Sequence, residues 1–229
     1  GPNAAPMLGI RGDVTIVDEA LTIDGTGPAS QPGVLVNVSG NNTLTGPAGD
    51  DRLEAGGGND RAFGGDGIDQ FVEEATKKDA GIRVRNLYDG GADYDGVSLT
   101  VGKGFSAKND VVKVNLGGGT LKITNHNYLD TLKSIESVFI DTKLRVVIKG
   151  SAADEHLEAG SGNDLIVGNG GSDTLWGQAG RDTLKGGAGA DDLYGGAGRD
   201  KLLGNTGDDH LQGEGGDDIL RGGAGADML

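Results

Sequence analysis

The sequence contains no cysteine, few aromatic residues and no long run of apolar residues. The lack of cysteine excludes a disulfide framework and any thiolate metal site. No stretch approaches the roughly 18 consecutive apolar residues of a membrane-spanning helix, so we expect no insertion into a membrane. Because aromatic residues make up only 4% of the chain, a conventional globule with a large packed core is also disfavoured.

Basic residues are also in short supply, since 35 acidic residues face 20 basic ones and the net charge is −15. A surface of this charge repels phosphate backbones, so we expect no nucleic-acid partner. Glycine, by contrast, accounts for 46 of the 229 residues. These glycines do not recur at every third position, which excludes collagen. Residues 150–229 hold 15 of the acidic residues and only 5 of the basic ones, so this part of the chain should attract cations most strongly.

The abundant glycine belongs to a nine-residue repeat that begins at Gly150 and continues to Leu229. Stretches such as GGAGADDLY and GGAGRDKLL have glycine at positions one and four, aspartate at position six and leucine at position eight. The same frame occurs earlier in residues 46–72, as GPAGDDRLE, AGGGNDRAF and GGDGIDQFV. Columns that stay in frame over so many repeats indicate a repeat architecture.

The repeats divide the chain into four parts. We expect an N-terminal β-strand lead-in or cap at 1–36, a first repeat block at 37–72, an intervening β segment at 73–149 and a second repeat block at 150–229. The second block stops within a repeat, so we expect it to be truncated at its C-terminus. The intervening segment either continues the solenoid as wider coils or forms a small separate β-sandwich, and a short helix is compatible with residues 126–134.

Each repeat combines a six-residue turn with a three-residue strand. Glycine tolerates positive φ, so the pattern GGxGxD predicts a tight turn with exposed carbonyl groups. Alternation along the strand points position eight to one side and its neighbours to the other. Two repeats therefore form one coil, and stacked coils predict an all-β parallel β-roll or β-helix solenoid. Its core would be a ladder formed by Leu157, Ile166, Leu175, Leu184, Leu193, Leu202, Leu211, Leu220 and Leu229.

This ladder is too thin to hold the fold alone, because one leucine per repeat buries too little apolar surface to offset the lost backbone entropy. Aspartates of successive coils would also stack as like charges. A cation that neutralises them would stabilise the fold, and carboxylate and carbonyl oxygens suit Ca²⁺ better than Mg²⁺ or Zn²⁺. In the alternative interpretation, each aspartate only forms hydrogen bonds with the backbone of its own turn.

The GGxGxDxLx columns resemble the RTX, or hemolysin-type, calcium-binding repeats of bacterial secreted proteins. The resemblance covers residues 37–72 and 150–229. It implies several Ca²⁺ ions held between stacked turns by pairs of aspartates and by turn carbonyls, such as those of Gly168, Gly177, Gly186, Gly195, Gly204 and Gly213. The pairs carried over are Asp51 with Asp69, Asp164 with Asp182, Asp173 with Asp191, Asp182 with Asp200, Asp191 with Asp209, Asp200 with Asp218, and Asp209 with Asp227. Asp60 would face Asn42, and Glu155 would face Asp173 with a longer side chain.

No catalytic motif accompanies the repeats, because neither HExxH nor GxSxG occurs. We therefore predict a non-catalytic calcium-binding module that folds on binding calcium outside the cell and is accessory to a polysaccharide-active exoenzyme. The resemblance implies type I secretion, and hence an extracellular or cell-surface location. The alternative is a structural segment of a calcium-dependent surface adhesin or S-layer protein. In isolation we expect a monomer.

A further alternative is a glycan-binding module. Trp176 and Tyr194 occupy the same repeat position one coil apart, so we expect them side by side on an outer face. Exposed aromatic rings flanked by polar groups can stack on sugar rings, whereas a cross-coil pair that only stabilises the sheet explains the same pattern.

Overall fold

A computed structural model describes residues 22–24, 34–36, 41–46, 48–54, 56–75, 86–102, 105–106, 108–126 and 128–229. The expected lead-in at 1–36 lies outside the described residues, except for two short strands. The described part of the chain contains strands and turns and no helix, so none of it forms a helix that could span a membrane. The predicted all-β solenoid is confirmed.

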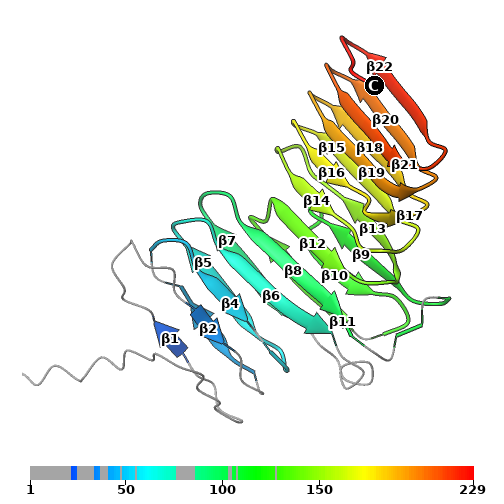
Figure 1. The fold of residues 1–229 in the computed structure, drawn as a ribbon. Helices are drawn as coiled ribbons and strands as arrows, with labels where there is room; N and C mark the ends of the chain where they lie inside the picture. The colour runs from blue at the N-terminus through cyan, green and yellow to red at the C-terminus, as the bar shows by residue number, and fades with distance from the viewer. Residues whose placement is uncertain are drawn as a thin grey trace, which may run out of the picture.

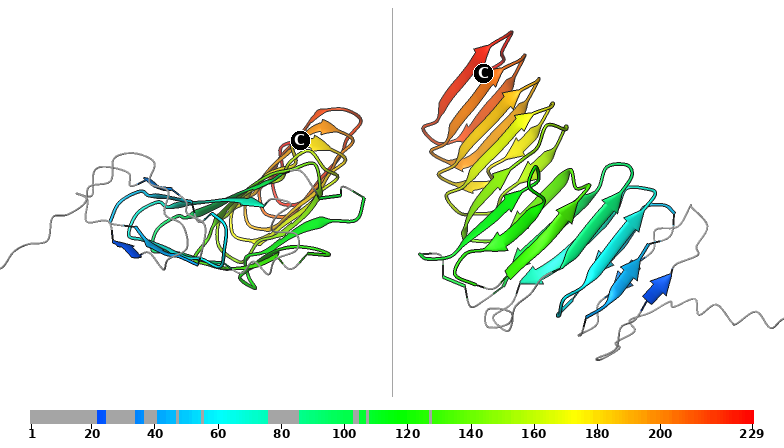
Figure 2. Two further views of the ribbon diagram at one scale, coloured as in Figure 1. Left: turned by 90° about the horizontal axis from the view of Figure 1, so that it is seen from below. Right: turned by 180° about the vertical axis from the view of Figure 1, so that it is seen from behind.

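The strands form two sheets that stack coil upon coil from β1 and β2 to β22 (Figure 1). The first sheet contains β1 (Thr22–Asp24), β3 (Thr43–Thr45), β5 (Arg61–Gly65), β7 (Leu87–Gly91), β9 (Val111–Asn115), β10 (Thr120–Ile123), β11 (Tyr128–Lys133), β13 (Arg145–Lys149), β15 (Leu165–Gly170), β18 (Thr183–Ala188), β20 (Lys201–Thr206) and β22 (Ile219–Ala224). The second sheet contains β2 (Val34–Val36), β4 (Arg52–Glu54), β6 (Gln70–Ala75), β8 (Gly96–Val101), β12 (Ser137–Asp141), β14 (His156–Glu158), β16 (Thr174–Trp176), β17 (Ala179–Gly180), β19 (Asp192–Gly198) and β21 (His210–Gly215). Figure 2 shows the same sheets from below and from behind.

The leucine ladder lies between the two sheets. In the second sheet Leu157 pairs in parallel with Leu175, and Leu175 with Leu193. The ladder residues Leu157, Ile166, Leu175, Leu184, Leu193, Leu202 and Leu211 are buried, as predicted. Leu220 is only partly buried. The prediction is wrong for Leu229, the last residue of the sequence, which is 68% exposed.

The intervening segment adds strands to both sheets. In the second sheet β8 pairs in parallel with β6 and β12, and β12 pairs with β14, so this sheet passes without a break from the first block to the second. In the first sheet β9, β10 and β11 form an antiparallel meander between β7 and β13. Residues 128–133, which were also compatible with a short helix, form the strand β11, which pairs with both β7 and β10.

The turns bring backbones of successive coils into close contact. Gly189, at position four of its repeat, has a φ of 127°, and a Cβ built on it would overlap the carbonyl oxygen of Gly171. Only glycine combines this positive φ with such a close approach. The glycine residues at this repeat position therefore set how tightly the coils can stack.

Removing one ladder side chain should weaken the fold in saturating calcium. Leu184→Ala removes a buried side chain, so we expect it to lower the free energy of unfolding by about 2–5 kcal/mol. Lys185→Ala changes the exposed neighbour in β18, so we expect an effect within about 0.5 kcal/mol. Denaturant unfolding measures both, and equal losses for the two variants would contradict the ladder as the core.

Candidate metal centre

Two columns of turns connect the sheets, one along each edge. We call first column the turns that lead from the first sheet to the second, such as 168–173 between β15 and β16. We call second column the turns that lead back, such as 177–182 between β16 and β18. The position-six acidic residue ends each turn, directly before a strand, so the parallel register stacks these residues along both columns.

In most of the stacked aspartates, the coil before holds one carboxylate oxygen. The backbone N–H of Asp164 donates to Asp182 Oδ1 at 2.7 Å, and that of Asp182 donates to Asp200 Oδ1 at 2.8 Å. The same bond joins every pair named from the sequence: Asn42 with Asp60, Asp51 with Asp69, Glu155 with Asp173, Asp173 with Asp191, Asp191 with Asp209, Asp200 with Asp218, and Asp209 with Asp227. The predicted neighbours are thus adjacent, in contrast to the alternative in which each aspartate bonds only within its own turn.

The other oxygen of the carboxylate is buried and has no hydrogen-bond partner. This holds for the Oδ2 atoms of Asp60, Asp69, Asp164, Asp173, Asp182, Asp191, Asp200 and Asp209, and for Glu155 Oε2. A buried carboxylate oxygen without a donor is expensive, so this repeated arrangement needs a positive partner.

The unpartnered oxygen faces a backbone carbonyl of the next coil. A Cβ built on Gly195 would lie 2.9 Å from both Asp200 Oδ2 and the carbonyl oxygen of Gly213. A Cβ on Gly177 would likewise lie 2.8 Å from Asp182 Oδ2 and 2.6 Å from the Gly195 carbonyl oxygen. Both oxygens therefore lie close to the place that a side chain would take. The position-one glycine thus lets a carboxylate and a carbonyl oxygen of successive coils come close together.

Burial raises the pKa of these carboxyl groups. The pKa of Asp173 and of Asp182 rises to about 7, chiefly through desolvation, and the stacked carboxylates next to them raise it further. Desolvation also raises the pKa of Asp164 and of Asp191 to about 6. None of the ion pairs in the described part of the chain involves these four residues. A cation bound beside these carboxyl groups would favour their charged form at neutral pH.

The donors fit a hard cation that accepts oxygen ligands. Among the described residues no three His, Asp or Glu side chains converge on one point, and the chain has no cysteine. A metal here must therefore combine two carboxylates with backbone carbonyls, as Ca²⁺ does with its 6–8 oxygen ligands. Zn²⁺ would lack its preferred nitrogen and sulfur ligands.

A comparison with known protein families identifies the family to which these turns belong. A model described as the RTX calcium-binding nonapeptide repeat matches in four copies, at residues 37–71, 149–184, 167–202 and 194–229. The chain belongs to the RTX calcium-binding repeat family. Repeats of this family bind Ca²⁺. A comparison with curated proteins found no match.

Glu155 occupies its RTX turn differently from the aspartates. Its Oε1 accepts the backbone N–H of Ser151 at 2.7 Å, so the longer side chain folds back onto its own turn. Its Oε2 has no partner, and a Cβ on Gly150 would lie close to both this oxygen and the Gly168 carbonyl oxygen. The extra methylene is thus accommodated, and the pairing of one carboxylate oxygen with one carbonyl is retained.

Sequence reasoning missed acidic and amide residues that continue both columns beyond the RTX blocks. In the first column, Asp69 N–H donates to Asp95 Oδ1 at 2.8 Å, and Asp95 N–H donates to Glu136 Oε2 at 3.0 Å. In the second column, Asn86 N–H donates to Asp130 Oδ1 at 2.9 Å. The frame GGADYD signals Asp95, whereas no motif marks Glu136, Asn86 or Asp130.

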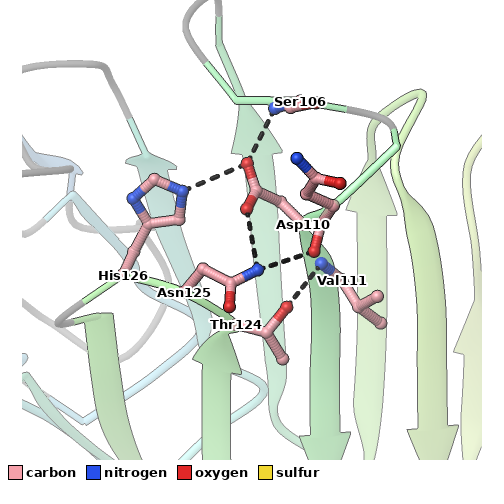
Figure 3. Close-up of polar contacts among 7 residues, drawn as sticks. Ser106, Asp110, Val111, Thr124, Asn125 and His126 are labelled. Carbon is pink, nitrogen blue, oxygen red and sulfur yellow. Dashed lines mark hydrogen bonds and ion pairs between the residues drawn. The ribbon is translucent and has the colours of Figure 1, made fainter.

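A separate polar cluster ties down the loop before β9 (Figure 3). Asp110 accepts the Ser106 backbone N–H at 2.7 Å and lies 3.1 Å from His126 Nε2. Burial alone would raise the pKa of Asp110. The hydrogen bonds from Ser106, His126 and Asn125 outweigh this effect and lower the pKa of Asp110 below its ordinary value. Ser106 takes part through its backbone N–H, and Thr124 Oγ1 accepts the Val111 N–H. These contacts therefore hold the loop in place and do not activate a hydroxyl.

Trp176 and Tyr194 lie side by side, as predicted. Their ring centroids are 4.0 Å apart and their planes differ by 12°, so the rings stack on each other. His210 meets Tyr194 edge-on at 6.0 Å. One face of each ring is thus covered by the other, and this face is not available to a sugar.

Without calcium, acidification should stabilise the fold. The folded-state pKa values of about 6 to 7 lie above the ordinary value of 3.8, so the folded chain binds more protons than the unfolded chain between these values. The stability gained from protonation is fully present below about pH 4 and is lost as the pH rises through about 6 to 7. Circular dichroism in EDTA should therefore show more β-structure at about pH 4.5 than at about pH 8. The reverse order would contradict the burial of these carboxyl groups.

Proposed function

We propose that this chain is a non-catalytic calcium-binding β-roll module in which the position-six acids and the turn carbonyls hold the ions. The observation that carries the proposal is the buried, unpartnered carboxylate oxygen that faces a glycine carbonyl, repeated from coil to coil. The ligands are Asp51, Asp69, Asp164, Asp173, Asp182, Asp191, Asp200, Asp209, Asp218 and Asp227, with Asp60, Asn42 and Glu155 at the variant positions.

Calcium binding drives folding in this proposal. An ion that binds only the folded chain adds about 4 kcal/mol per site at a thousandfold excess over Kd. The chain stays open where calcium is scarce and folds where it is abundant, outside the cell. Typical RTX proteins leave the cell by type I secretion, and a chain that folds only after export suits that route.

We place the module beside a separate catalytic part of a longer exoenzyme that acts on polysaccharide. The half-buried Trp176–Tyr194 pair supports this setting, since aromatic rings that stay partly open to solvent can contact carbohydrate.

Circular dichroism with metal exchange tests calcium-driven folding. At neutral pH in EDTA we expect a coil spectrum, because the stacked carboxylates repel one another. Added Ca²⁺ should produce the β spectrum, whereas equal Mg²⁺ should not, because Mg²⁺ requires a tighter octahedron and keeps its waters. A β spectrum that persists in EDTA at neutral pH would refute metal-driven folding.

A matched pair of variants tests the ligand assignment. Asp182→Asn removes one charge from a buried position-six carboxylate, so we expect it to raise the calcium concentration at half-folding by about tenfold. Asp192→Asn removes the same charge from the exposed position seven in β19, where the side chain contacts His210, so the midpoint should change little. Equal midpoints for the two variants, measured by circular dichroism, would contradict the assignment.

A further inference from the structure

The first column continues through the intervening segment, outside the residues that the RTX model matches. β8 pairs with β12 in a register that places Gly96 opposite Ser137, so Asp95 lies next to Glu136. The two residues are joined as the repeat aspartates are, by a hydrogen bond of 3.0 Å from the Asp95 N–H to Glu136 Oε2. The second column differs here, because the β9–β11 meander separates its two parts.

Asp95 has the same unpartnered oxygen as the repeat aspartates. Its side chain is fully buried, and Oδ2 has no hydrogen-bond partner. A Cβ built on Gly90 would overlap both this oxygen and the carbonyl oxygen of Ser134, so the two oxygens face one point. Ser134 thus occupies the place that a glycine carbonyl takes in the repeats.

The backbone around Ser134 directs this carbonyl toward Asp95. Ser134 has a φ of 47°, in the left-handed region that non-glycine residues rarely adopt. It lies in the short turn between β11 and β12, two residues before Glu136. One turn outside the repeats therefore supplies both the carbonyl that faces Asp95 Oδ2 and the carboxylate that accepts the Asp95 N–H.

We propose that Asp95, Glu136 and the Ser134 carbonyl form an additional calcium site that joins the two RTX blocks. The inference rests on the proposed function, since the ion is the one that the repeats bind. The site makes the first column continuous from the first block to the second. Calcium binding would then link the folding of the two blocks along this edge.

Calcium stoichiometry of the folded full chain tests the proposal. Asp95→Asn keeps an oxygen that can accept the Asp69 N–H but removes the charge, and Glu136→Gln removes the charge on the opposite side. We expect each variant to bind at least one calcium fewer than the unaltered chain, by equilibrium dialysis at saturation. Asp93→Asn removes the same charge from an exposed turn residue at a φ of 76°, which asparagine tolerates, and should leave the stoichiometry unchanged.

The outcomes separate this inference from the proposed function. If Asp182→Asn weakens calcium binding while Asp95→Asn and Glu136→Gln bind as many ions as the unaltered chain, the additional site is refuted and the repeat sites stand. If the unaltered chain binds no calcium, the proposed function itself fails. Circular dichroism in calcium reports whether each variant folds. If Asp95→Asn fails to fold, the calcium stoichiometry of Glu136→Gln, which alters a partly exposed side chain, tests the additional site.

Discussion

The fold depends on how stacked, buried carboxylates are neutralised. Each position-six aspartate from Asp164 to Asp209 has one oxygen tied to the backbone of the preceding coil and a second oxygen buried without a donor. Desolvation of even one such charge costs several kcal/mol, and the neighbouring like charges add to that cost. One buried leucine per repeat returns only about 2–3 kcal/mol. A cation between successive turns resolves this conflict, because it converts the repulsion along each column into attraction.

This constraint explains which residue occupies each main position of the nine-residue repeat. Glycine at position one lets the carboxylate and carbonyl oxygens approach each other where a side chain would clash, as at Gly195. Glycine at position four allows the positive φ that brings turns together, as at Gly189. Aspartate at position six supplies the charge, and leucine at position eight supplies the core. In the proposed function, a sequence with this repeat folds where the ion is present and stays open where the ion is scarce.

The periodic features could be predicted from the sequence because they are local and repeated. Position eight marked the buried ladder, and the spacing of the aspartates marked the pairs that the structure brings together. The meander of β9 to β11 could not be predicted, since its strands lack the nine-residue frame and part of it, residues 128–133, was also compatible with a helix. Glu136 could not be predicted as a site residue, because no motif marks it. Only the register between two distant strands places it beside Asp95. Leu229 fits the ladder pattern but is exposed, because burial requires a neighbouring coil that periodicity alone does not provide.

The most direct test of this account is anomalous diffraction from crystals grown in calcium, collected where the calcium signal is strong. We predict peaks between successive turns of both columns, each about 2.3–2.6 Å from a position-six carboxylate oxygen and from a turn carbonyl oxygen. The Asp182–Asp200 pair in the second column is the reference position. Turns that show no anomalous peak, with only water beside the carboxylates, would contradict the claim that a cation holds the stacked acids together.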